Sequence, residues 1–209
     1  MSRNFRRGKN MDRKSRQRPL LISCGILQPE IEALVARGEI EAEAFFLNKY
    51  LHMDYRKLHD ALKASLRKHR GRKPVVVYGD VCLGFNGEMQ ALMTECDAVK
   101  VDGLNCIDCL LGGRGKLLEI DSDHRLFFLT PAFLEFSEHL ITGTKKVNRR
   151  RFNMLKGIMI VDSLGDMKRH RNRIEHFSDQ TGLPVLEHRV VGLEGLKAVI
   201  EEALQRCWQ

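Results

Sequence analysis

Six cysteines are the residues of this 209-residue chain whose type and spacing could most readily carry out chemistry. Four of them follow short apolar runs or lie in a glycine-rich turn beyond one, namely Cys24, Cys82, Cys106 and Cys109. Thiolates are soft ligands that suit zinc, copper(I) and iron–sulfur centres. Cys106 and Cys109 have the Cys-x-x-Cys spacing of a two-ligand clip, although one clip alone is weak evidence. The pattern raises the hypothesis of a thiolate-ligated centre.

Three interpretations of these thiols are open. They could bind a metal ion or cluster, act as reactive thiols, or be small buried hydrophobic residues, since free cysteine is among the most buried residue types. The chain has no second Cys-x-x-Cys and no histidine pair at zinc-finger spacing. Three or four cysteines without a convergent histidine favour an iron–sulfur cluster or a cysteine-rich zinc site. Cys96 and Cys207 are expected to be structural.

Polar residues and glycines surround the four thiols. Asp80 flanks Cys82 and is a candidate acid/base or orienting group, with a plain turn residue as the alternative. His52 could reach the same place, or could be a surface or capping residue. The glycines that would allow close approach of the backbone to a bound cofactor are Gly25, Gly79, Gly84 and Gly103.

Seven short apolar runs must position these residues. We expect strands at residues 19–23, 42–47, 74–78, 98–101, 126–129, 158–161 and 185–191. The run at 75–77 is β-branched and does not alternate, which is typical of a strand covered on both faces. Helical patterns follow most runs, including one capped by Asp54 and one that Thr130 and Pro131 begin.

This alternation predicts an α/β fold with a single doubly wound, mostly parallel sheet of the flavodoxin or Rossmann-like type, and helices on both faces. Crossovers between parallel strands are nearly always right-handed, and we expect the strand order 2-1-3-4-5. In that order the first, third and fourth strands are neighbours. Cys24, Cys82 and Cys106 would then meet at the carboxyl edge of the sheet, where such folds bind ligands.

Most of the formal net charge of +8 belongs to the first 18 residues, which have eight basic side chains and one acid. We expect residues 1–18 to be a disordered basic tail and residues 19–209 to be a single α/β domain. The tail could contact nucleic acid or an anionic surface weakly, or could merely aid solubility. No apolar run reaches the roughly 20 residues of a membrane span, and no secretory signal is evident, so we expect a cytoplasmic location.

Other catalytic motifs are weak or missing. The segment at residues 112–116 lacks the first glycine and the hydroxyl residue of a Walker A loop. No G-x-G-x-x-G follows the first strand, and no G-x-S-x-G is present. The rival to a metal centre is therefore a domain that binds an anionic small molecule or nucleotide at helix N-termini without a metal.

Several of these pieces together resemble domain-of-unknown-function family 1638, and the likeness runs over nearly all of residues 20–200. They are Ser23-Cys24-Gly25, Leu51-His52, Tyr78-Gly79-Asp80 with Cys82, then Cys106 and the stretch Phe127-Phe128-Leu129-Thr130. The family usually shows Gly-Asp-Cys-Gly, whereas here Val81 intervenes. The usual histidine before the third cysteine is Asn105, and Cys109 is additional.

The resemblance implies an uncharacterised α/β protein, with corrinoid or one-carbon methyl metabolism as its setting. We expect a cysteine-ligated metal or iron–sulfur centre that supports redox or small-molecule chemistry. The metal, the substrate and the question of whether the centre is catalytic stay open.

Overall fold

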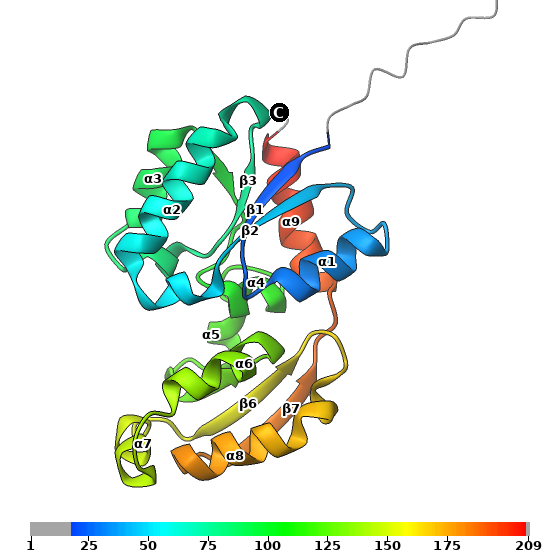
Figure 1. The fold of residues 1–209 in the computed structure, drawn as a ribbon. Helices are drawn as coiled ribbons and strands as arrows, with labels where there is room; N and C mark the ends of the chain where they lie inside the picture. The colour runs from blue at the N-terminus through cyan, green and yellow to red at the C-terminus, as the bar shows by residue number, and fades with distance from the viewer. Residues whose placement is uncertain (1–17, 208–209) are drawn as a thin grey trace, which may run out of the picture.

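The structure is a computed structural model that describes residues 18–207. This part of the chain contains seven strands, each where an apolar run predicted it. They are β1 (Leu20–Cys24), β2 (Glu43–Leu47), β3 (Val75–Val77), β4 (Val99–Lys100), β5 (Leu126–Leu129), β6 (Gly157–Asp162) and β7 (Val185–Val190). They form a four-stranded sheet of order β2-β1-β3-β4 and a three-stranded sheet of order β5-β6-β7. Figure 1 shows the two sheets in two lobes.

Helices connect and cover the strands. The α-helices are α1 (Gln28–Ala36), α2 (Tyr55–Lys68), α3 (Glu88–Cys96), α4 (Cys106–Leu111), α5 (Lys116–Ile120), α6 (Pro131–Leu140), α7 (Lys145–Arg151), α8 (Arg171–Thr181) and α9 (Glu194–Cys207). Four 3-10 helices are η1 (Lys49–Met53), η2 (Arg70–Arg72), η3 (Asp80–Leu83) and η4 (Met167–His170). The predicted caps are confirmed, because the side chain of Asp54 accepts a hydrogen bond at the start of α2 and that of Thr130 does so at α6.

The α/β class with parallel strands is confirmed, and the first sheet has the order predicted for its four strands. The expectation of one sheet is wrong, because β5 begins a second sheet instead of joining β4. β4 is only two residues long and offers little edge for another strand. After β4 the chain forms α4 and α5 in place of one long crossover helix, and these helices lead it into the second lobe (Figure 1).

The two sheets share apolar packing through β6. Met159 and Val161 belong to the large core built around the first sheet, whereas Ile158 and Ile160 pack with Phe177 of α8 in a smaller core. Side chains alternate along a strand, so β6 contributes one face to each core. After β7 the chain returns, and α9 packs back on the first sheet (Figure 1).

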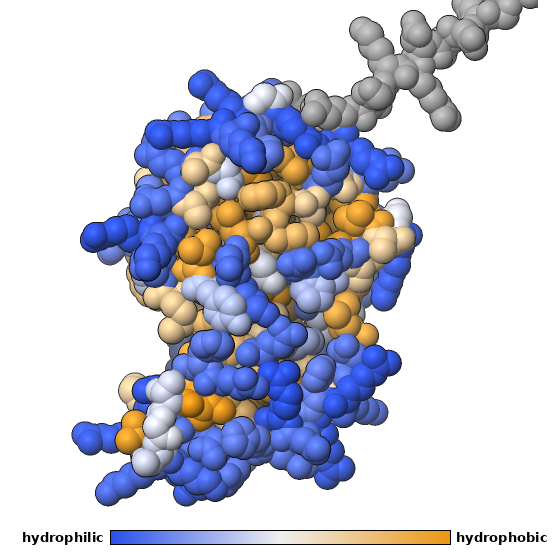
Figure 2. Space-filling model, in the orientation of Figure 1, coloured by the Kyte–Doolittle hydropathy of each residue, from blue (hydrophilic) through white to orange (hydrophobic). Residues whose placement is uncertain are grey.

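Charged side chains cover much of the surface, and hydrophilic residues dominate the face of the smaller lobe seen in Figure 2. In residues 18–207 no helix combines the length and apolar character needed to cross a bilayer. The predicted basic tail lies outside the described residues except for Arg18. Its contact with nucleic acid or an anionic surface therefore stays a prediction.

Candidate functional site

The carboxyl edge of the first sheet receives a thiol from three separate segments. Cys24 ends β1, Cys82 lies in η3 just after β3, and Cys106 begins α4 beyond β4. All three side chains are buried. Burial, reinforced by the nearby Cys82, raises the pKa of Cys24 to about 12. Burial and the charges that Cys82 and Cys24 would carry also raise the pKa of Cys106. The structure thus brings together the three thiols that the sequence placed at one edge.

The loops after β3 and β4 are bonded to each other. The backbone N–H of Asp80 donates to the carbonyl of Gly103 at 3.0 Å, and that of Val81 donates to Leu104 at 3.0 Å. A Cβ atom at Gly79 would collide with the backbone of the opposite loop. Glycine at this position therefore allows the close approach that brings the segments carrying Cys82 and Cys106 side by side.

The other predicted glycines also lie at tight contacts. A Cβ at Gly103 would be 2.7 Å from the Sγ of Cys109, and a Cβ at Gly25 would be 2.7 Å from the carbonyl oxygen of Leu47. Gly84 has a positive φ of 136°. These contacts give the glycines a role in packing, and a role in holding a cofactor stays a prediction.

The fourth thiol is fixed by α4. Cys109 is fully buried, and burial together with the neighbouring Cys82 raises its pKa to about 12. Asp108 beside it is also fully buried and accepts hydrogen bonds from the backbone N–H groups of Leu104, Gly115 and Leu117 at 2.9, 3.1 and 2.9 Å. The glycine-rich segment is therefore anchored to a carboxylate, which is unlike the arrangement of a phosphate-binding loop.

His52 joins the thiol site. Its Nε2 lies 2.7 Å from the Sγ of Cys24. Burial lowers the pKa of His52 to about 4, while Cys24 has a raised pKa. Both groups are therefore neutral at pH 7, so the S–H of Cys24 can donate a hydrogen bond to the imidazole. This pair differs from the thiolate–imidazolium pair of an activated cysteine nucleophile.

Tyr78 places a hydroxyl group among the same residues. Its side chain is only 1% exposed, and its ring lies 6.3 Å from that of His52 in a stacked arrangement. Burial, followed by the charge that Cys24 would carry, raises its pKa above the usual value. No hydrogen bond of ordinary geometry reaches the hydroxyl oxygen from the described residues, but the Cys24 thiol is its neighbour, and a hydrogen bond between the two groups contributes to the pKa of each.

Asp80 lies in an ion-pair network beside the thiols. It pairs with Lys100 at 2.7 Å and with Arg114, which also pairs with Asp102 at 2.7 Å. Partial burial would raise the pKa of Asp80, but the bonds from Lys100 and Arg114 outweigh that effect and hold the pKa below its usual value. Asp80 is therefore ionised at pH 7 and suits the predicted orienting role better than that of a proton donor.

The sequence missed Tyr78, Lys100 and Arg114 as members of this region. Tyr78 had a signal in the Tyr-Gly-Asp piece of the family resemblance. Lys100 and Arg114 had none, because they come from separate segments that only the tertiary structure brings to Asp80.

A metal ion would find suitable donor atoms here. Thiolates and imidazole suit soft ions, and the buried hydroxyl of Tyr78 could donate a hydrogen bond to a ligand of such an ion. Within residues 18–207, however, no three His, Cys, Asp or Glu side chains already have the arrangement of a metal site. Binding would therefore require these side chains to reorient and the thiols to lose their protons.

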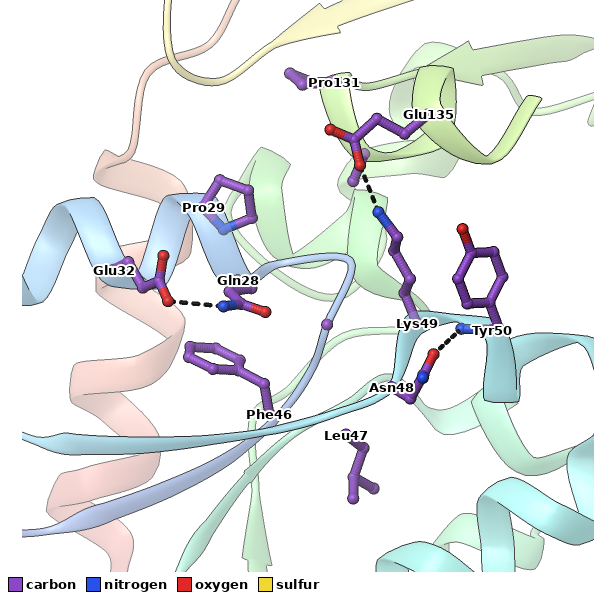
Figure 3. A pocket seen from close by; sticks show the side chains of 12 residues that line it. Gln28, Pro29, Glu32, Phe46, Leu47, Asn48, Lys49, Tyr50, Pro131 and Glu135 are labelled. Atoms are coloured by element: carbon purple, nitrogen blue, oxygen red, sulfur yellow. Dashed lines mark hydrogen bonds and ion pairs between the residues drawn. The ribbon is translucent and has the colours of Figure 1, made fainter. Parts of the chain in front are cut away.

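A cavity of about 460 Å³ lies beside this region, between the two lobes (Figure 3). Gly25, Lys49 and Tyr50 line it from the first lobe, and Pro131 and Glu135 line it from α6. An ion pair between Lys49 and Glu135 crosses it. The cavity adjoins the thiol site along the chain, since Gly25 follows Cys24 and Lys49 begins the 3-10 helix that carries His52.

Comparisons with known proteins give one match. A family model described as a protein of unknown function (DUF1638) matches residues 46–200, well over half of the chain. No curated protein and no solved structure gives a significant match. The matched span contains His52, Tyr78 and three of the clustered thiols, and it begins after Cys24.

Proposed function

The chain belongs to domain-of-unknown-function family 1638, and from the site in this member we propose that it binds a soft metal ion or an iron–sulfur cluster. Cys24, Cys82 and Cys106 are the proposed ligands, and Cys109 is the fourth. The bound centre would supply redox chemistry if it is an iron–sulfur cluster, or a Lewis acid if it is zinc. Corrinoid or one-carbon methyl metabolism is the setting that the family resemblance implies.

The observation that carries this proposal is the burial of three thiols from separate segments at one edge of the first sheet. β1 pairs with β3, and backbone hydrogen bonds join the loops after β3 and β4. Burying the thiols together favours their neutral forms. A cation that displaced the thiol protons would remove the mutual repulsion of the thiolates.

The surrounding residues would prepare the site. His52 can accept the thiol proton of Cys24 or serve as a nitrogen ligand, since it lies 2.7 Å from the sulfur. Burial raises the pKa of Cys82 to about 11. The positive charge of Lys100, which is only 9% exposed, acts in the opposite direction and favours the thiolate. Asp80 ties Lys100 and Arg114 to the loop that holds Cys82. A small-molecule substrate would enter from the cavity between the lobes.

The cavity favours a second candidate function. α1 and α6 both begin at its wall, and Lys49 contributes a positive charge that is paired with Glu135, while Glu32 also lines the cavity. Helix N-termini and a lysine suit an anionic small molecule that takes the place of Glu135 beside Lys49. On this alternative the chain is a binding module without a metal, and the thiols are simply buried.

Metal and sulfide analysis separates the two candidates. We expect anaerobically purified protein to contain zinc, or iron with acid-labile sulfide. Cys24→Ser, Cys82→Ser and Cys106→Ser should each lose most of this content. Cys96→Ser is the matched control, because Cys96 ends α3 outside the thiol site. Protein that is metal-free after anaerobic purification and after incubation with zinc or iron and sulfide would overturn the proposal and favour the binding module.

A further inference from the structure

β7 is an exposed strand at the edge of the second sheet. All six of its residues are exposed, including Val185, Leu186 and Val190 at 43%, 56% and 65%. In the described part of the chain its only strand neighbour is β6 (Figure 1). A six-residue edge strand with exposed apolar side chains is a template for pairing with another chain.

The later part of β7 is regular enough to accept such a partner. Its pairing with β6 shifts register near Leu186, which lies between the two residues paired with Ile158 and Met159. From Glu187 to Val190 the register is continuous. The backbone N–H of Val191 donates to the carbonyl of Asp162 in β6 at 2.9 Å. In a strand, the N–H and C=O groups of successive residues point alternately to its two sides. The N–H and C=O groups of Val190 and His188 therefore point to the free edge.

The side chains of this edge are complementary to themselves. Consider two copies paired antiparallel about a two-fold axis at His188. Glu187 of each copy then lies opposite Arg189 of the other copy, and Leu186 of each copy lies opposite Val190 of the other. Directly opposed residues of antiparallel strands are about 4.5–5.5 Å apart, close enough for ion pairs and apolar contact.

We propose that two copies of this chain pair through β7 to form a continuous six-stranded sheet. The same patch serves on both copies, as a two-fold dimer requires. Within each copy Glu187 and Arg189 already form an ion pair of 2.7 Å, and pairing would extend it to an alternating network of four charges. A groove of about 450 Å³ beside β7, lined by Ile160, Met167 and Val185 among others, continues the apolar surface at this edge.

Charge reversal tests both the dimer and its register. In light scattering across a dilution series, the full-length chain should have the mass of a dimer. Glu187→Arg and Arg189→Glu should each be monomeric, because like charges would then face each other across the axis. The double variant E187R/R189E should recover the dimer, and an equimolar mixture of the two single variants should form a heterodimer.

Circular dichroism would establish that each single variant keeps its fold, and recovery on mixing provides a second check that does not depend on that spectrum. A monomeric full-length chain at every concentration would overturn the proposal. A single variant that stays dimeric, or a double variant that stays monomeric, would equally contradict pairing in this register.

Discussion

Protonation decides what the thiol site can do as it stands. Burial keeps the thiols of Cys24, Cys82 and Cys109 protonated at pH 7 and keeps His52 neutral. Thiol nucleophiles act as thiolates, so the site without a bound cation is chemically quiet. A soft cation changes this balance because it binds the deprotonated form. On the proposed function, any activity would therefore belong to the loaded site and not to a free cysteine.

The hydroxyl of Tyr78 gives the first prediction. Tyr78→Phe removes a buried hydroxyl whose neighbour is the weakly accepting sulfur of Cys24, so the stability of the metal-free variant should be within about 1 kcal/mol of the parent or higher. Zinc affinity should fall, because the hydroxyl would no longer support a ligand of the ion. Urea unfolding with a chelator and competition with a zinc indicator measure the two effects. A clear loss of stability without metal would mean that the hydroxyl is paired within the protein.

Glu30 gives a prediction on pH. Its side chain is 1% exposed, one carboxyl oxygen accepts a hydrogen bond from the Oγ of Ser163 at 2.6 Å, and the other oxygen has no partner in residues 18–207. Burial raises the pKa of Glu30 above that of the unfolded chain. The protonated carboxyl therefore stabilises the fold. This stabilisation is complete at pH values below the pKa of glutamate in the unfolded chain, and it is lost as the pH rises through the pKa of Glu30 in the folded chain.

Glu30→Gln should therefore raise the free energy of unfolding at pH 7, by about 1 kcal/mol, since no buried charge then needs to be accommodated. The gain should shrink as the pH falls from the folded pKa of Glu30 toward the unfolded pKa of glutamate, and should be absent below the unfolded pKa. Urea denaturation at pH 7 and at a pH below the unfolded pKa measures the difference. Ser163→Ala provides a comparison that removes the hydrogen bond and leaves the carboxyl in place. A variant that is less stable at pH 7 would contradict this account of Glu30.

The elements of the first lobe were largely predictable from the sequence, because the buried β1 and β3 are uninterrupted apolar runs. The order of its strands was expected from the flavodoxin-like pattern, one of the few topologies that right-handed crossovers allow. The helix α7 could not be predicted from periodicity, because its sequence KKVNRRR has no apolar stripe. α4 was taken for a turn, although Asn105 caps it and the pattern Asn-x-x-Asp could have signalled its start. The second sheet was missed because the brevity of β4 is visible only in the structure.

The site was predictable to the extent that it follows from strand order. Cys24, Cys82 and Cys106 could be placed at one edge because each follows a recognisable strand. The bond between His52 and Cys24 could not, since η1 is an irregular segment whose path depends on tertiary packing. The ion pairs of Asp80 likewise depend on loops whose contacts leave no periodic pattern.

The bonded loops give a prediction at the scale of elements. Gly79→Ala should lower the free energy of unfolding by about 1–3 kcal/mol, because the added methyl group would push apart the loops that carry Cys82 and Cys106. Gly71→Ala is a matched control, since a Cβ there meets nothing within 4 Å. Thermal unfolding measures both variants. Equal stability of the two variants would show that the loops are not held in close contact.

At the scale of the molecule, the lobes are joined more by packing than by charge. Met159 and Val161 of the second sheet belong to the core of the first, whereas the Lys49–Glu135 pair lies at the surface with Glu135 58% exposed. Exposed ion pairs contribute about 0–1 kcal/mol. The expectation of one domain over residues 19–209 stays a prediction, which a denaturation experiment can test.

We predict a single unfolding transition for the metal-free chain in calorimetry, with equal calorimetric and van't Hoff enthalpies. Met159→Ala should lower the free energy of unfolding by about 2–5 kcal/mol, as truncation of a buried methionine does. Glu135→Ala should cost less than about 1 kcal/mol. Two separate transitions in the parent chain would show instead that the lobes fold independently.

Anaerobic titration with cobalt(II), whose bonds to thiolates produce charge-transfer absorption, tests most directly whether the thiols bind a metal ion together. We predict that this absorption rises to saturation at one ion per chain. It should be lost or strongly reduced in Cys24→Ser, Cys82→Ser and Cys106→Ser. Cys96→Ser should retain it. Absence of the absorption in the parent chain, or its undiminished presence in all three variants, would contradict the proposed centre.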